Sequence, residues 1–168
     1  MKKIRLILTA AAIATLALGA CTAKNENART TEDEVAATQE SVPAGVIDLS
    51  GVDKDADGIY ILENGLTIQP GMQCDRPVVI DFNAPWCGPC RRFAPVFEEA
   101  AKKYGDRIHF VSVNTDNVRD MMQNFGLPSG IPTVLVIRTD GTYTSRTGLG
   151  DIYPAEKFEK LIKDNTGI

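Results

Sequence analysis

Cys87 and Cys90 are separated by two residues, a spacing that allows a dithiol to close and reopen as a disulfide. They follow a strand-like run, 77–82, and precede a helical run, 91–104. The N-terminus of such a helix brings roughly half a positive charge and unpaired N–H groups to the first sulfur. That field favours the thiolate, which is the nucleophilic form of cysteine. The spacing therefore predicts thiol–disulfide exchange.

The elements that would position this dithiol are predicted from apolar periodicity and turn residues. We expect strands at 46–49, 78–82, 108–113, 133–138 and 142–147, and helices at 91–104, 118–125 and 154–163. A β-hairpin is expected over 58–69, because Asn64-Gly65 separates two runs that favour strands. Strands that alternate with helices and end in a hairpin indicate an α/β fold, a mixed sheet with helices on both faces.

Composition limits the classes of partner. The chain has 168 residues, 43% hydrophobic and 24% charged, with a net charge of −4, as is typical of a globular protein. Lys2, Lys3 and Arg5 are the only charged residues among the first 20, so the remaining chain carries −7. An acidic domain without a basic patch argues against nucleic acid as a partner.

The N-terminus has the pattern of an export signal. Residues 1–20 combine a basic start with an apolar run from Leu6 to Leu18, which is short for a membrane span. Leu18-Gly19-Ala20-Cys21 resembles the bacterial lipobox, which implies a lipidated Cys21; an ordinary signal-peptidase site is the alternative. Residues 21–45 are then the lipidated cysteine and a polar, flexible tether, with a reach of about 25 Å. Which membrane carries the anchor stays open.

The other metal- and redox-capable residues have simpler interpretations. Cys74 is expected to be a small buried residue before a strand, with a regulatory thiol as the alternative. His109 is expected to be a half-buried structural residue of a strand. A zinc site needs four ligands, and the chain offers one histidine and one spare cysteine. We therefore expect neither a metal nor a cofactor.

The motifs around the dithiol resemble those of the thioredoxin family. The matching residues are Asp81-Phe82-Asn83-Ala84-Pro85-Trp86-Cys87-Gly88-Pro89-Cys90, then Pro95, then Gly130-Ile131-Pro132-Thr133, and finally Gly148. The resemblance implies a thioredoxin fold over residues 46–168, a central mixed β-sheet flanked by helices. The hairpin at 58–69 would be an extra N-terminal element, where the family usually has a first helix.

The resemblance also implies roles. Cys87 is expected to be the exposed nucleophile that forms a mixed disulfide with the substrate. Cys90 is expected to be the buried resolving thiol. Asp81 matches the family's buried carboxyl, which exchanges a proton with the resolving cysteine. Burial raises the pKa of such a carboxyl toward neutrality.

A substrate groove beside the disulfide follows from the same resemblance. Pro132 matches the family's cis-proline, and an extended substrate chain would lie along it. The expected lining is Trp86, Gly88, Pro89, Ile131, Pro132 and Gly148.

Two positions depart from the family. Asn83 stands where a tryptophan is frequent, and Ser112 aligns with a buried lysine that commonly faces the aspartate. Without that cation, we expect Asp81 to titrate at a higher pH than in relatives that have the lysine.

The expected function is a thiol–disulfide oxidoreductase of the cell envelope that reduces or exchanges disulfides in exported proteins. Gly88-Pro89 between the cysteines and Ile131 before the proline resemble the reducing members of the family. A reductase in an oxidising compartment needs electrons from a transmembrane thiol carrier. The alternatives are a net thiol oxidase, and a peptide-binding or chaperone module whose cysteines are passive.

Overall fold

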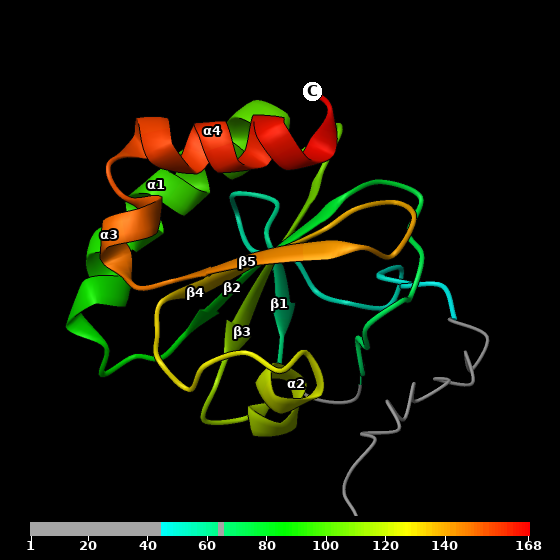
Figure 1. Cartoon of the computed structure of the whole chain (residues 1–168), viewed down its shortest axis with the longest axis horizontal. Helices are drawn as coiled ribbons and strands as arrows, with labels where there is room; N and C mark the ends of the chain where they lie inside the picture. Colours follow the sequence, from blue (N-terminus) through cyan, green and yellow to red (C-terminus); the bar gives the residue numbers. More distant parts are fainter. Residues whose placement is uncertain (1–44, 64–65) are drawn as a thin grey trace, which may run out of the picture. The chain divides into compact units, whose positions relative to one another are not determined.

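The computed structural model describes residues 45–63 and 66–168. Their centre is a mixed sheet of five strands in the order β1-β3-β2-β4-β5 (Figure 1). The strands are β1 (Tyr60–Leu62), β2 (Val78–Asn83), β3 (His109–Asn114), β4 (Thr133–Ile137) and β5 (Tyr143–Thr147). β2 runs parallel to β3 and antiparallel to β4, so it occupies the middle of the sheet. The central mixed sheet is therefore as expected.

Helices cover both faces of the sheet. The bounds are α1 (Gly88–Tyr104), α2 (Arg119–Asn124), α3 (Leu149–Ile152) and α4 (Ala155–Thr166). α1, α3 and α4 form one apolar core with the sheet, in which Phe93 and Phe158 meet edge to face at 5.0 Å between ring centroids. α2 and the segment before β2 form the second core, on the opposite face (Figure 1).

Alternation along β2 and β3 decides which side chains face α1. Val78, Ile80 and Phe82 belong to the core on the α2 side, whereas Val79 belongs to the core on the α1 side. Successive side chains of a strand point to opposite faces. Asp81 and the residues in register with it on β3 therefore lie on the α1 side, where the dithiol is.

The region before β2 corrects two expectations. The predicted hairpin over 58–69 is wrong in its second arm: β1 forms its first arm, but 66–69 contains no strand, and the turn residues 64–65 lie outside the described part. β1 instead pairs in parallel with β3 on one edge, and the segment before it bridges the other edge, where Lys54 is the antiparallel partner of Tyr60. Ile68 is fully buried through side-chain packing. The strand expected at 46–49 is reduced to a single bridge between Val46 and Gln73.

None of the helices within 45–63 and 66–168 has the length and apolar character needed to cross a bilayer. The expectations for 1–20 and for Cys21 lie outside the described residues, as does almost all of the tether 21–45.

Candidate active site

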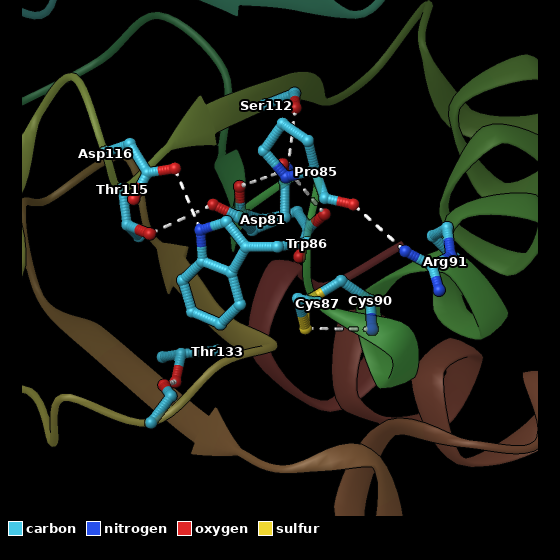
Figure 2. Close-up of a disulfide and its surroundings, with 12 residues drawn as sticks. Asp81, Pro85, Trp86, Cys87, Cys90, Arg91, Ser112, Thr115, Asp116 and Thr133 are labelled. Atoms are coloured by element: carbon cyan, nitrogen blue, oxygen red, sulfur yellow. Dashed lines mark hydrogen bonds between the residues drawn. A yellow bond between two sulfur atoms is a disulfide. The ribbon is translucent and has the colours of Figure 1, made fainter.

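A disulfide joins Cys87 and Cys90 at the N-terminus of α1, with their Cα atoms 5.3 Å apart (Figure 2). Cys87 is the N-cap residue, with extended backbone, and Pro89 lies in the first turn, where its missing N–H costs nothing. The backbone N–H of Cys90 donates to Cys87 Sγ at 3.1 Å. Because this N–H and the helix dipole both point at the first sulfur, the site would stabilise a thiolate on Cys87 once the disulfide is reduced.

The two cysteines are equally buried, which corrects the expectation that Cys87 is exposed. Each is 4% exposed in the disulfide form. Ala84 packs against them, and Ile131 from the loop before β4 covers them further. A substrate disulfide must therefore approach the buried sulfur of Cys87 past a rim of surrounding residues.

Trp86 forms the most prominent part of that rim. Its side chain is 67% exposed, yet its position is fixed by a hydrogen bond from the indole Nε1–H to Asp116 Oδ2 at 2.9 Å (Figure 2). Asp116 is held in turn, because its backbone N–H donates to Asn114 Oδ1 at 3.0 Å. A large apolar surface that is exposed but positioned is suited to contact another protein.

The loop before β4 is tied to β5. The Ile131–Pro132 peptide bond is cis, as expected, and Pro132 O accepts a hydrogen bond from Gly148 N–H at 2.8 Å. Gly148 has φ of 88°, a conformation in which a side chain is strained. Thr133 Oγ1 donates to Gly130 O at 2.7 Å and so closes the loop on itself. These contacts place Pro132 and Gly148 side by side, as the predicted groove requires.

Asp81 is a buried carboxyl of β2 that lines the same cavity as Cys90. It is 4% exposed, and burial raises the pKa of Asp81 to about 7, while a hydrogen bond from Asn83 acts in the opposite direction. Asp81 Oδ1 has no hydrogen-bond partner among the residues that the structure describes. A carboxyl that titrates near neutral pH can take up and release a proton under physiological conditions.

A cavity of about 270 Å³ connects Asp81 with Cys90, because both residues line it. Asn83 and Ser112 also line it, and Asn83 Nδ2 donates to Asp81 Oδ2 at 3.0 Å and to Ser112 Oγ at 2.9 Å. The lysine of the family pattern is thus replaced by an uncharged pair of side chains. The expectation that Asp81 titrates at a higher pH than in relatives with the lysine stays a prediction.

Cys74 and His109 are not part of this site. Cys74 is buried next to β2, donates to Arg138 O at 3.5 Å, and burial raises the pKa of Cys74 to about 11. A thiol with that pKa is a poor nucleophile. His109 is also buried, and its Nε2 pairs with Asp75 Oδ1 at 2.9 Å. Cys74 is buried as expected, whereas His109 is more deeply buried than the half-buried position expected from the sequence.

Three features of the site had no sequence prediction. The first is Asp116, which accepts the hydrogen bond from Trp86, and the second is the hydrogen bond from Thr133 Oγ1 to Gly130 O. Both depend on how the folded chain brings these residues together, which no local pattern indicates. The contact from Asn83 to Asp81 had a usable signal, since residues two apart on a strand share a face.

These features define a class of protein before any comparison: a dithiol–disulfide exchange protein, with a Cys-X-X-Cys disulfide at a helix N-terminus and a buried carboxyl in the adjoining cavity. The family model described as Thioredoxin matches residues 69–164. Thioredoxin of Borreliella burgdorferi is 42% identical over 93 residues, which are 55% of this chain and 76% of that protein. Thioredoxin of Alicyclobacillus acidocaldarius is 41% identical over 96 residues, 57% of this chain and 88% of that protein.

A plant relative matches over a shorter part. The chloroplastic thioredoxin M-type of Zea mays is 48% identical over 67 residues, 40% of this chain and 40% of its own length. The chain belongs to the thioredoxin family. The expected fold, a thioredoxin fold with a central mixed sheet flanked by helices, is thereby confirmed, and the protein is a disulfide oxidoreductase.

Proposed function

We propose that this protein reduces or exchanges disulfides in exported proteins of the bacterial cell envelope, through a cycle of the Cys87–Cys90 dithiol and disulfide. The observation that carries the redox part is the disulfide at the N-terminus of α1 beside the buried carboxyl of Asp81. The cycle transfers two electrons from the dithiol to a substrate disulfide, and no cofactor takes part.

In the first step, the Cys87 thiolate attacks one sulfur of the substrate disulfide. A bond forms between Cys87 Sγ and that sulfur, and the substrate's own disulfide breaks. The released substrate sulfur leaves as a thiolate and takes a proton from solvent. The N–H of Cys90 that points at Cys87 Sγ supports this step, because it stabilises negative charge on the attacking sulfur.

In the second step, Cys90 resolves the mixed disulfide. The thiol of Cys90 gives its proton to Asp81, and the resulting thiolate attacks Cys87 Sγ. The Cys87–Cys90 bond forms and the second substrate sulfur leaves. The raised pKa of Asp81, which burial brings to about 7, makes it a base of suitable strength for a thiol.

The substrate chain would lie in extended form along the cis-proline loop, with Trp86 and Pro89 as the outer rim and Gly88, Ile131, Pro132 and Gly148 nearer the disulfide. What supports this groove is the exposure of Trp86 and the contact between Gly148 and Pro132. Backbone hydrogen bonds to an extended segment tolerate many sequences, as a general oxidoreductase requires.

Location and electron supply rest on the sequence of residues 1–45. Lipidation of Cys21 would anchor the protein to a membrane, with the domain 46–168 on a tether in the periplasm. A transmembrane thiol carrier would then re-reduce the disulfide. Replacement of Cys21 by serine should release the protein from the membrane fraction and abolish labelling with a fatty acid. Retention and labelling of the variant would contradict the anchor.

Reduction of insulin disulfides tests the enzymatic function. The Cys87→Ser variant should be inactive, whereas Cys74→Ser, which removes a buried thiol outside the site, should retain wild-type activity. If activity in the cell survives Cys87→Ser, the protein acts instead as a peptide-binding or chaperone module.

The net direction is tested by the redox state of the pair in cells, measured by acid quenching and alkylation with a mass-adding thiol reagent. A reductase keeps Cys87 and Cys90 mostly reduced, so both gain mass. If both are mostly protected as the disulfide, the protein is a net thiol oxidase. Cys74 adds at most one tag, which a Cys74→Ser variant removes.

A further inference from the structure

Asn83, the last residue of β2, links the buried carboxyl to the neighbouring strand. Its Nδ2 lies 3.0 Å from Asp81 Oδ2 and 2.9 Å from Ser112 Oγ. The same nitrogen also lies 3.3 Å from the backbone oxygen of Asp81, and its two hydrogens serve the two shorter contacts. Register explains the arrangement: Asp81 and Asn83 share a face of β2, and Ser112 is paired with Asp81 on β3 (Figure 2 shows these two).

This contact makes the two oxygens of Asp81 unequal. Oδ2 accepts from Asn83, so a proton placed on Oδ2 would face an N–H donor and lose that hydrogen bond. Oδ1 has no partner among the described residues, and a buried charged oxygen without a partner is costly. The neutral carboxyl therefore carries its proton on Oδ1, and Asn83 is the group that selects this atom.

The cavity offers a route between Asp81 and the dithiol. Its volume of about 270 Å³ has room for water, and its wall includes polar side chains from Asp81, Asn83 and Ser112 beside Cys90. The other charged groups that line it are Asp55, Arg91 and Glu98. Arg91 Nη1 donates a hydrogen bond to Pro85 O at 3.0 Å, so the guanidinium group of Arg91 binds a backbone carbonyl.

We propose that Asn83 is a positioning residue of the disulfide chemistry, which holds Oδ2 of Asp81 and leaves Oδ1 as the atom that exchanges a proton with Cys90 through water in the cavity. The proposal rests on the proposed function only in assigning the resolving step to Cys90. In that step the S–H bond of Cys90 breaks, its proton passes through water to Oδ1, and the electron pair on sulfur forms the new bond to Cys87 while the substrate thiolate leaves.

Ser112 completes the arrangement as the second anchor of the amide. With a short hydroxyl at this position, Asn83 reaches across to β3 and is held at both acceptors. Removal of Ser112 Oγ would take away one acceptor that orients the amide and so weaken its contact with Asp81. The effect of Ser112→Ala should therefore have the same direction as loss of Asn83 and be smaller.

The first test is a carbon-13 NMR titration of the Asp81 carboxyl in the intact, oxidised protein labelled at aspartate, with the signal assigned by its loss in Asp81→Asn. Asn83→Leu removes the donor at similar volume. Because a hydrogen bond to the charged form lowers an acid's pKa, its loss should raise the titration midpoint of Asp81 by about one pH unit. Ser112→Ala should raise it by less. An unchanged or lowered midpoint in Asn83→Leu would overturn the proposal.

The second test separates positioning from a structural role. The rate at which Cys90 resolves a mixed disulfide is measured against pH for the wild type, Asn83→Leu, Asp81→Asn and the double variant. Asn83→Leu should move the pH midpoint upward in the presence of Asp81 and change the rate less than twofold in the Asp81→Asn background. An equal loss of rate in both backgrounds would show that Asn83 does not act through Asp81. If Asn83→Leu fails to fold, Asn83→Ala takes its place in both tests.

Discussion

Replacement of Asp81 by asparagine should change the dependence of stability on pH. The folded protein holds the proton of Asp81 up to about pH 7, since burial raises its pKa to about 7, whereas the unfolded chain releases it near 3.8. Between these values the folded state binds more protons, so the free energy of unfolding falls as the pH rises. Asparagine cannot ionise, and the fall should be absent.

The magnitude follows from the difference of about 3 pH units, at about 1.4 kcal/mol for each unit. Relative to acid pH, the raised pKa of Asp81 lowers the free energy of unfolding by on the order of 4 kcal/mol at about pH 8.5. About 2 kcal/mol of this fall has already occurred at about pH 5, because the unfolded chain ionises first. The wild type should therefore lose about 2 to 3 kcal/mol between about pH 5 and about pH 8.5 relative to Asp81→Asn.

Urea unfolding of the oxidised proteins at these two pH values gives the comparison directly. Burial lowers the pKa of His109, but His109 is present in both proteins, so its contribution to the pH dependence cancels. Asp120→Asn, the same change at an exposed carboxyl of α2, should retain the wild-type fall. Equal pH dependence in the wild type and Asp81→Asn would refute the reasoning.

Three other substitutions have defined outcomes. Ser112→Lys should lower the pKa of Asp81 and move the pH–rate profile of the resolving step to lower pH; an unchanged profile would contradict this. Asp116→Ala should release the indole of Trp86, which is the only tryptophan of the chain. The fluorescence emission of Trp86 should shift, and KM for a protein substrate should rise. An unaltered spectrum and KM would mean that the hydrogen bond does not position the ring. Gly141→Ala should lower the free energy of unfolding by about 1 to 3 kcal/mol, because φ of Gly141 is 84° and a Cβ would lie 2.7 Å from the backbone oxygen of Gly71. A urea midpoint equal to that of the wild type would exclude this strain.

The sequence contained most of the fold because its strongest signals are local. The apolar run that became β2, the amphipathic pattern of α1 and the Asp140-Gly141 turn between β4 and β5 each act within a few residues. The error at 58–69 has a physical reason: alternation around a turn suits a hairpin, but one edge of β1 pairs with β3, which is distant in sequence, and the other is bridged by Lys54 in the segment before it. α3 was not foreseen, since four residues carry no clear period.

The site was predictable where residue type alone defines the chemistry. The spacing of Cys87 and Cys90 predicted a disulfide, and the structure contains it. Burial of Cys87 was not predictable, because it depends on the loop that brings Ile131 over the sulfurs. The family pattern marks Asn83 only as a departure, whereas its hydrogen bond to Asp81 follows from the position of both residues on the same face of β2.

The central claim is that Cys87 attacks substrate disulfides and Cys90 resolves the product, and trapping tests it most directly. Intact protein carrying Cys90→Ser is incubated with a disulfide-containing substrate, in a Cys74→Ser background that excludes the spare buried thiol. A covalent complex should accumulate, disappear on addition of reductant, and be absent when Cys87 is serine. No complex with Cys90→Ser, or an equal amount with Cys87→Ser, would contradict the account.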